Sequence, residues 1–325
     1  MHVICIQQKG FDPYFNLAVE EYLLKNFAED VFMLWRGERS IVVGKHQNAL
    51  AEINHRYVAE NKIKIARRIS GGGTVFHDPG NLNFTFIKTV DRIDQVNFKV
   101  FTRPIVAVLE KLGLEAYTSG RNDLVMDGKK ISGNAEHVYK KRVLHHGTLL
   151  FDSDLSQLRD ALKVDLSRFK DKAVQSNRSE VGNIAAFLDQ KMDIEAFSDF
   201  IFEGIRETYP ENRVFQFSEE EVAAIQKLRD EKYATWDWIY GYSPKYKYSN
   251  QLEMRGQTIS FSLDVVKGII NSIDFLGKIS NEQAILLTNA LLDTRHDYWE
   301  LEQKLRKIEV GLAPIPVDKL LDSLV

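Results

Sequence analysis

Residues 63–88 have the sequence IKIARRISGGGTVFHDPGNLNFTFIK, and their pattern indicates the class of fold. Apolar and β-branched runs predict strands over Ile63–Arg68, Thr74–Asp78 and Leu82–Lys88, the last of which alternates as a half-buried strand does. Pro79-Gly80-Asn81 is a turn signal. Closely spaced strands of this kind lack the regular βαβ repeat of a parallel sheet, so we expect a mixed or antiparallel sheet.

The segments around this stretch add helices and further strands. Asp12 is predicted to cap a helix that begins at Pro13 and continues to about Lys25. The other expected elements are strands over His2–Gln7, Val31–Arg36, Ser40–Gly44 (paired with the preceding one) and Val143–Phe151, a hairpin around Asp127-Gly128, helices over Ile53–Asn61 and Phe98–Leu112, and helical material from Leu155 to about Tyr209. The fold class is therefore α+β, with a mixed or antiparallel β-sheet and flanking helices.

A change in composition marks a second, smaller α+β domain. Residues 236–250, WDWIYGYSPKYKYSN, are aromatic, contain Gly and Pro, and have no helical period. Beyond them, apolar residues at 259, 261 and 263 alternate with polar ones as in a strand, and two helical patterns follow. We expect a first domain over 1–240, a linker over 241–250 and a C-terminal domain over 251–325.

The composition is that of an ordinary globular protein and excludes several classes. The 325 residues contain 43 basic and 46 acidic side chains, so the net charge of −3 gives no field that attracts nucleic acid. No run approaches the ~18 consecutive apolar residues of a membrane span. The N-terminus lacks the basic region of a signal peptide. The single cysteine, Cys5, fits a reducing compartment. We expect a cytoplasmic monomer with no nucleic-acid or membrane partner.

Three consecutive glycines, Gly71 to Gly73, interrupt the strand pattern directly after Arg68 and Ser70. They cost roughly 2–3 kcal/mol of extra chain entropy, which is tolerated where backbone must approach something closely. Successive N–H groups without Cβ atoms can bind an anion, and the Arg68 guanidinium suits phosphate or carboxylate. A flexible hairpin loop beside a surface arginine explains the same residues equally well. The pattern is neither a Walker A loop nor a GxGxxG turn.

The hairpin around Asp127-Gly128 carries a second candidate cation. If its second strand alternates, Lys130 and Ser132 share one face and Ile131 points to the other with Lys129. An ammonium on that face, opposite the glycines, can bridge two anionic groups. A pair of solvated lysines is the more common interpretation of such a sequence.

Other polar signals are weaker. His145-His146 lies in a predicted strand, where a neutral packed histidine is the usual state, and the adjacent residues His77 and Asp78 point to opposite faces. No group of His, Cys, Asp or Glu has the spacing of metal ligands, so we expect no metal site made by the protein alone. Cys5 lies in the first strand, where a buried thiol is inert.

Taken together, these motifs resemble the signature of lipoate–protein ligases, within the biotin and lipoate protein ligase superfamily. The resemblance is carried by 67–78 (RRISGGGTVFHD), 80–85 (GNLNFT), 119–125 (SGRNDLV), 130–135 (KISGNA) and 145–149 (HHGTL), and continues in Asp12-Pro13, Arg178 and Trp236-Asp-Trp. It covers essentially the whole chain, and it matches 251–325 to the accessory domain of the family. The domain over 1–240 is then the catalytic, lipoate- and ATP-binding domain.

The resemblance implies a reaction in two steps. Lipoate reacts with ATP and Mg²⁺ to give lipoyl-AMP, and the lipoyl group then passes to a lysine of a carrier protein; no prosthetic group takes part. The implied carriers are lipoyl domains of 2-oxoacid dehydrogenase E2 subunits and the H protein of glycine cleavage.

The motif match also implies which residues carry the reaction. Lys130 would be catalytic and would contact both lipoate and the α-phosphate, with Ser70 as a second lipoate-binding residue. ATP and the adenylate would be bound by Arg68, Gly73, Thr74, Val75, Phe76 and Lys130. Asp123 would help to hold the magnesium–phosphate end, and Gly72, His77 and His146 complete the expected site.

Three alternatives remain open at this stage. Octanoyl or lipoyl transferases share the scaffold without using ATP, and those that transfer between carriers need a cysteine nucleophile, for which Cys5 is in the wrong place. Biotin–protein ligases use related chemistry with a different glycine motif. A non-catalytic scaffold that binds lipoate or the carrier is the third, and the presence of Lys130 and Arg68 counts against it.

Overall fold

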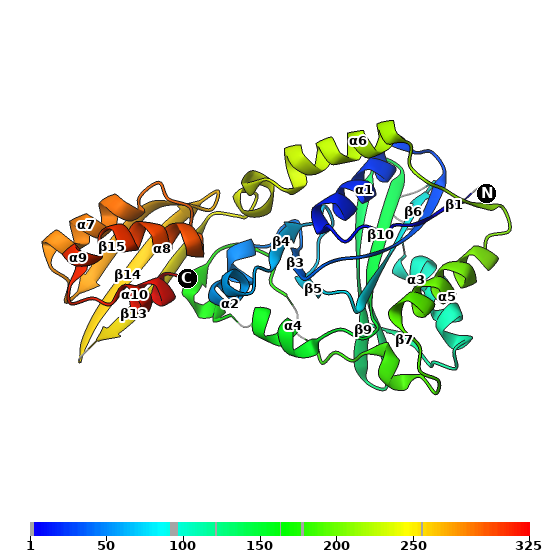
Figure 1. Ribbon diagram of the computed structural model, residues 1–325, viewed down its shortest axis with the longest axis horizontal. Coiled ribbons are helices and arrows are strands. Elements are labelled where there is room, and N and C mark those ends of the chain that lie inside the picture. Colours follow the sequence, from blue (N-terminus) through cyan, green and yellow to red (C-terminus); the bar gives the residue numbers. More distant parts are fainter. Residues whose placement is uncertain (1–2, 92–96, 121, 163, 177–178, 255) are drawn as a thin grey trace. The chain divides into compact units, whose positions relative to one another are not determined.

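The computed structural model describes residues 3–91, 97–120, 122–162, 164–176, 179–254 and 256–325 (Figure 1). The chain forms two compact units. Unit one comprises residues 1–45, 64–158 and 176–235, and unit two comprises residues 46–63, 159–175 and 236–325. Each unit is thus assembled from three separate stretches of sequence. Among the described residues, no helix is long and apolar enough to cross a membrane.

The described part of unit one contains an eight-stranded mixed sheet with the order β12-β1-β2-β6-β10-β9-β8-β7. β1 is parallel to both of its neighbours, and the other pairs are antiparallel. The strands are β1 (Val3–Gln7), β2 (Asp30–Arg36), β6 (Asn81–Thr89), β7 (Tyr117–Ser119), β8 (Asp123–Met126), β9 (Lys129–Tyr139), β10 (Arg142–Leu150) and β12 (Asn212–Val214). The expected mixed sheet and the β8–β9 hairpin at Asp127-Gly128 are confirmed.

One face of this sheet packs on α3 (Phe98–Glu110) and α5 (Ile194–Glu207) and forms the main core (Figure 1). Phe84 and Phe86 of β6 lie in this core, and both are at most 1% exposed. Because side chains alternate along a strand, Asn83 and Thr85 of β6 point to the opposite face. That second face is unusually polar for a buried surface.

A second, three-stranded sheet has the order β4-β3-β5, made by β3 (Ser40–Val43), β4 (Lys64–Arg67) and β5 (Val75–His77). The expected pairing of Val31–Arg36 with Ser40–Gly44 is wrong, since β2 pairs with β1 and β6 while β3 pairs with β4 and β5. β2 and β3 are both buried along almost their whole length. Each of them has a neighbouring strand on both edges within its own sheet.

Helix α1 (Pro13–Asn26) begins as predicted, with Asp12 as its N-cap and Pro13 in its first turn. It buries three polar side chains, Asn16, Glu20 and Glu21. α6 (Glu219–Leu228) lies beside α1 and continues into the π-helical turn η5 (Arg229–Tyr233) (Figure 1).

The predicted helical material from Leu155 to about Tyr209 is only partly helical. Helices occupy α4 (Leu155–Ala161), the short turns η3 (Leu166–Arg168) and η4 (Ile184–Phe187), and α5. The described residues between η3 and η4 are not helical, and part of their backbone bonds to another segment: Lys130 N donates to Glu180 O and Gly182 N donates to Lys130 O. This long-range pairing overrides local helix propensity.

Unit two contains a four-stranded antiparallel sheet in the order β11-β13-β14-β15 among its described residues. Its elements are η1 (Ala49–Ala51), α2 (His55–Glu60), β11 (Phe169–Lys170), η6 (Asp237–Gly241), β13 (Tyr246–Met254), β14 (Gln257–Val266), β15 (Ile269–Gly277), α7 (Asn281–Leu291), α8 (Tyr298–Lys307), α9 (Glu309–Leu312) and α10 (Val317–Leu324). Ile259, Phe261 and Leu263 are buried on one face of β14, as predicted. The α+β class is confirmed for both units.

The aromatic segment 236–250 is not devoid of helix, contrary to expectation. Residues 237–241 form the π-helical turn η6, and the ring of Trp236 packs on that of Tyr240 with centroids 4.3 Å apart. Trp238 and Tyr242 form a second pair at the same spacing of four residues, 4.9 Å apart. Ring contacts at i and i+4 stabilise a helical turn, a spacing that the sequence analysis overlooked.

Candidate functional site

The glycine loop, residues 69–74, connects β4 to β5 and is organised by Arg68. The guanidinium donates from Nε to Ser70 Oγ (3.0 Å) and from Nη1 to Val42 O (3.0 Å). Its Nη2 donates to Gly71 O (2.7 Å) and Gly73 O (2.6 Å). Arg68 is only 5% exposed. It therefore draws the loop carbonyls toward itself and places a positive charge directly behind the loop.

The loop needs glycine at specific positions. Gly72 has φ of +90°, a conformation that residues with a Cβ adopt at a cost. A Cβ added at Gly44 would lie 2.1 Å from Gly72 O, so the strand end at Gly44 and the loop are in direct backbone contact. On the other side, Ser176 Oγ accepts from Thr74 N (2.9 Å) and would lie 3.1 Å from a Cβ at Gly73. The loop is a built structure rather than a flexible hairpin.

Ser70 connects the loop to the polar face of the large sheet. Its Oγ lies 2.6 Å from Nε2 of His146, on β10, and Nδ1 of His146 lies 2.9 Å from a Glu20 carboxylate oxygen on α1. Thr85 Oγ1 donates to Glu20 (2.6 Å) and accepts from Trp35 Nε1 (3.3 Å). All five side chains are buried. They form one continuous hydrogen-bonded chain across α1, three strands and the loop.

Lys130 lies on β9, and its Nζ is 2.9 Å from Oδ1 of Asp123 on β8; both side chains are about one quarter exposed. A Cβ at Gly133 would lie 3.1 Å from this Nζ, so the lysine folds back along its own strand. The register shifts between Leu124 and Val125, so strict alternation does not hold here. Ile131 and Ser132 are both fully buried, which does not distinguish the two faces of the sheet.

The remaining expected site residues lie on β5 or beside it. Val75 pairs with Val42 and is half-buried, whereas the Phe76 side chain is only 2% exposed. His77 is also buried, and its Nδ1 has no hydrogen-bond partner among the described residues. Burial, followed by the charges of Arg68 and His146, lowers the pKa of His77 to about 3, so it is neutral.

Helix α1 is held in place by two charged groups. Glu21 Oε1 bonds Lys25 (2.6 Å), and its Oε2 bonds Lys232 (2.5 Å) and Tyr233 (2.5 Å). Burial raises the pKa of Glu21, but the hydrogen bonds from Lys232, Lys25 and Tyr233 outweigh it and the net pKa is lowered. This carboxylate ties α1 to the end of α6.

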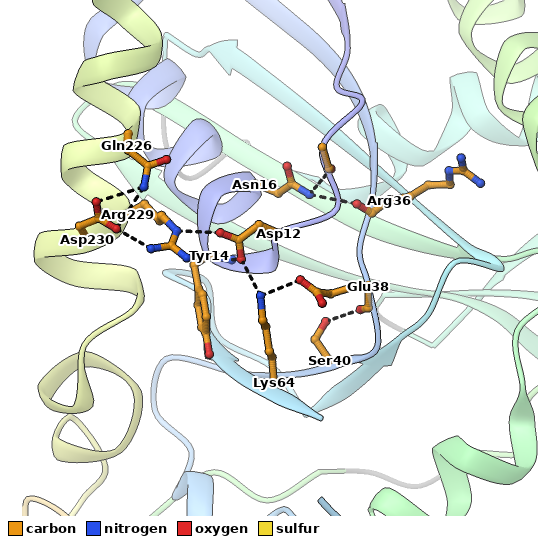
Figure 2. Close-up of polar contacts among 11 residues, drawn as sticks. Asp12, Tyr14, Asn16, Arg36, Glu38, Ser40, Lys64, Gln226, Arg229 and Asp230 are labelled. Atoms are coloured by element: carbon orange, nitrogen blue, oxygen red, sulfur yellow. Dashed lines mark hydrogen bonds and ion pairs between the residues drawn. The ribbon is translucent and has the colours of Figure 1, made fainter. Parts of the chain in front are cut away.

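The second group lies at the N-terminus of α1 (Figure 2). The Asp12 carboxylate accepts from Arg229 Nε (2.7 Å) and lies 3.5 Å from Lys64 Nζ, which also bonds Glu38 (2.7 Å). Both cations lie 5.6 Å from the ring centroid of Tyr14. Burial is the largest cause that raises the pKa of Tyr14 to about 12. These contacts fix the start of the helix that carries Glu20.

A protein-only metal centre is not built within the described residues, which contain no group of three or more His, Cys, Asp or Glu that could hold an ion. Asp123 offers one carboxylate, already paired with Lys130. A single carboxylate of this kind contributes one oxygen ligand to a divalent cation and does not build a site alone. Two further motif positions, Arg121 and Arg178, lie outside the described residues.

The structure thus brings Arg68, Ser70, the glycine loop and His146 together, and it places Lys130 against Asp123. The sequence analysis missed Glu20, Thr85 and Ser176. Glu20 had a detectable signal, because a carboxylate inside the apolar stripe of a helix is rarely buried without a partner. Ser176 had none, since its contact is set by the path of the chain between distant elements.

Comparison with known proteins identifies relatives along nearly the whole chain. Residues 12–206 match the family described as the lipoyl protein ligase A/B catalytic domain. Residues 243–324 match the bacterial lipoate protein ligase C-terminus. The lipoate–protein ligase LplJ of Bacillus subtilis is 42% identical over 270 residues, which cover 82% of each chain. Lipoate–protein ligase 1 of Staphylococcus aureus is 40% identical over 303 residues, 92% of each chain.

Two solved structures of similar fold are described together with a partner domain or a ligand. A bi-partite lipoate protein ligase from Thermoplasma acidophilum, studied with its E2 lipoyl domain, has a TM-score of 0.64 and 28% identity, covering 74% of this chain and 96% of that one. A lipoate-protein ligase A bound with ATP has a TM-score of 0.63 and 28% identity, covering 74% of this chain and 98% of that one.

Proposed function

This chain belongs to the lipoate–protein ligase family, and we propose that it activates lipoate with ATP to lipoyl-AMP and transfers the lipoyl group to a specific lysine of a carrier protein. The observation that carries the proposal is the glycine loop. Arg68 holds it in shape, Ser70 anchors it to β10, and the cation Lys130 stands on the neighbouring strand β9.

This arrangement suits the first step of the reaction. A carboxylate must attack the α-phosphate of ATP, and the two anions repel each other. At ~4 Å and an effective dielectric of about 20, one compensating unit charge contributes roughly 4 kcal/mol before desolvation. Lys130, the buried charge of Arg68 and the N–H groups of the loop supply that compensation. Lys130 must exchange its bond to Asp123 for bonds to substrate.

The residue roles follow from this chemistry. We assign Lys130 as the catalytic residue that contacts lipoate and the α-phosphate, and Ser70 as a ligand of the lipoate carboxylate. The residues assigned to ATP and the adenylate are Arg68, Gly72, Gly73, Thr74, Val75, Phe76 and Lys130. Asp123 would face the Mg²⁺ that accompanies ATP, and His77 and His146 support the loop from behind.

The partners and setting are part of the same proposal. The acceptors would be lipoyl domains of 2-oxoacid dehydrogenase E2 subunits or the H protein of glycine cleavage; the match to a ligase studied with its E2 lipoyl domain supports the first. We place the enzyme in the cytoplasm as a monomer. Residues 1–240 would form the catalytic part, 241–250 the linker and 251–325 the accessory part.

The transferase alternative requires a reactive thiol. Cys5 is the one cysteine of the sequence, it is fully buried in β1, and burial raises its pKa to about 11. A buried thiol of this kind is a poor nucleophile. The structure therefore offers no cysteine for a thioester intermediate.

The test is lipoate-dependent exchange of labelled pyrophosphate into ATP, followed by the intact mass of an apo-lipoyl domain incubated with protein, ATP and lipoate. We expect exchange only when lipoate is present, and a carrier mass increased by one lipoyl group. Transfer without ATP from an already lipoylated or octanoylated carrier protein would identify a transferase instead. Binding of lipoate with neither exchange nor transfer would identify a scaffold.

A further inference from the structure

The bonds of His146 define the proton on its ring. Nδ1 faces the Glu20 carboxylate at 2.9 and 3.1 Å, and Nε2 faces Ser70 Oγ at 2.6 Å. An ionised carboxylate has only acceptors, so Nδ1 carries a proton and donates it to Glu20. In the neutral ring Nε2 is then an acceptor. The hydrogen bond that it accepts comes from the Ser70 hydroxyl.

Ser70 consequently has nothing left to donate. A hydroxyl has one proton and two lone pairs. In the described part of the chain its two partners are Arg68 Nε, which donates to it at 3.0 Å, and His146 Nε2, which takes its proton. Ser70 is 0% exposed before a ligand enters, so in that state bulk water does not replace His146 as the acceptor of its proton. In this state Ser70 presents only a lone pair to a ligand, and a lone pair repels a carboxylate.

This conflicts with a carboxylate substrate at Ser70 unless a proton is added. We propose that the site takes up one proton, on Nε2 of His146, when the lipoate carboxylate binds to Ser70, and that Glu20 makes this uptake possible. The inference rests on the proposed function, since it names how the same site accepts its substrate. Glu20 acts here as a positioning residue and does not touch the substrate.

The exchange of bonds is balanced. The bond from the Ser70 hydroxyl to Nε2 breaks, Nε2 receives a proton from solvent, and the new Nε2–H donates to Ser70 Oγ. The hydroxyl proton turns to the substrate carboxylate, while Arg68 Nε continues to donate to the same oxygen. Ser70 Oγ then accepts two hydrogen bonds and donates one, which is its full capacity.

The charges around the His146 ring favour uptake of a proton only when the Glu20 carboxylate and the lipoate carboxylate are both present. The titratable groups that interact with His146 are Glu20 from α1, His77 from β5, His137 from β9 and its neighbour His145, and the charge of Arg68 reaches it through Ser70. Burial is the largest cause that lowers the pKa of each of these three histidines, so they are neutral. Before binding, Glu20 balances Arg68; the incoming carboxylate balances the imidazolium.

The experiment is titration calorimetry of the full-length protein with lipoate alone, in buffers of different ionisation enthalpy between pH 7 and 8. The dependence of the heat on the buffer counts protons directly. We expect about one proton taken up per lipoate, with affinity that falls about tenfold per pH unit, as linkage to one proton requires. The lipoate carboxylate stays ionised throughout this range and contributes nothing.

Two variants and a matched control test whether the hydrogen-bonded series Glu20–His146–Ser70 takes up the proton. Glu20→Gln keeps the shape but removes the charge that stabilises the imidazolium, so the proton count should fall toward zero. Ser70→Ala removes the hydroxyl and should do the same. Glu21→Gln is the control, because Glu21 is equally buried on the same helix but bonds Lys25, Lys232 and Tyr233 instead of His146. Its proton count should equal that of the wild type.

The outcomes separate the inference from the function on which it rests. Wild-type protein that binds lipoate without proton uptake overturns the inference even if no variant folds. Unchanged uptake in folded Glu20→Gln overturns it as well. Pyrophosphate exchange on the same preparation reports the proposed function independently. If neither exchange nor lipoate binding occurs, both the function and the inference fail.

Discussion

In the proposed site, Ser70 and Lys130 are the side chains at which an anionic substrate would replace a bond that the protein already makes. Lys130 was identifiable from sequence as a candidate, but its salt bridge with Asp123 was not, because that contact depends on the register of β8 against β9. The partners of Arg68 were equally unpredictable. Its donors bond the backbone of the loop and of β3, and only the folded path of the chain brings these carbonyls together.

Replacing Lys130 should abolish activity without unfolding the protein. Lys130→Ala removes the mobile cation of the site, and we expect kcat/KM for pyrophosphate exchange to fall about 10²–10³-fold, the cost of losing one charge-stabilising donor. Lys130→Arg should not restore it, because a planar fork does not replace a compact ammonium in the space above Gly133.

The matched control for this prediction is Lys129→Ala, the exposed neighbour on the same strand. It should retain wild-type kinetics. Comparable losses of activity in the Lys129 and Lys130 variants would show that activity depends on the total positive charge of the hairpin and not on Lys130 in particular.

Cys5→Ser should remain an active ligase. The thiol is fully buried and its pKa is raised to about 11, so it takes no part in the chemistry. A hydroxyl in the same apolar position should cost about 1–3 kcal/mol of unfolding free energy. Urea unfolding and pyrophosphate exchange measure the two effects separately. An inactive but normally folded variant would revive the thioester mechanism.

At the scale of elements, the start of α1 was predictable and the partner of β3 was not. Asp12-Pro13 is a local signal, readable from two adjacent residues. The neighbours of β2 and β3 depend instead on which sheet buries each strand, and short runs of apolar residues do not contain that information. The polar face of β6 shows the same limit, since alternation indicated two faces but not what covers each.

Asp12 combines two roles that substitution can separate. Asp12→Ala removes both the cap and the ion pairs with Arg229 and Lys64, and should cost about 1–2 kcal/mol of unfolding free energy. Asp12→Asn keeps a capping oxygen and loses only the charge, so it should cost less than about 1 kcal/mol, because these side chains are partly exposed. Urea unfolding of the two variants gives the comparison, and equal losses would contradict a separate capping contribution.

The glycine loop should be sensitive at Gly72 and tolerant at Gly71. Gly72→Ala forces a Cβ into a positive φ and should cost about 1–2 kcal/mol, with weaker ATP binding because Arg68 is displaced from the loop. Gly71→Ala meets no atom within 4 Å and should change the unfolding free energy by less than about 0.5 kcal/mol. Thermal unfolding and ATP calorimetry test this pair. Identical stability of the two variants would argue against the built loop.

For the whole molecule, two α+β bodies were predictable from the composition change near residue 240. What the sequence did not indicate is that residues 46–63 and 159–175 pack with the C-terminal body. β11, two residues long, pairs with β13 across more than 70 positions, and nothing in Phe169 and Lys170 announces that partner.

Unit two should lose stability in acid, as should unit one, in which burial lowers the pKa of His77 to about 3. His55 and His296 stack with ring centroids 6.0 Å apart, and burial is the first cause that lowers the pKa of each from 6.5 to about 4. The unfolded chain therefore binds more protons between pH 6.5 and 4. The stabilisation is complete above pH 6.5 and is lost as the pH falls, by at most roughly 3 kcal/mol per histidine.

His296→Gln should flatten this dependence, since the amide can still donate to Leu324 O and accept from Tyr246. Urea unfolding at pH 7.5, 6 and 5, followed by hydrogen exchange in β13–β15, measures it for this unit. A wild-type midpoint that is constant down to pH 5 would contradict the assignment.

The three-segment construction of unit two has a consequence for synthesis on the ribosome. Residues 46–63 emerge long before the strands β13–β15 that complete their unit exist. At about 5–20 residues per second, the roughly 210 residues from 64 to the end of β15 take on the order of 10–40 seconds to be translated. During that interval residues 46–63 have no sheet on which to dock. Unit two is therefore completed only after β13–β15 have been translated.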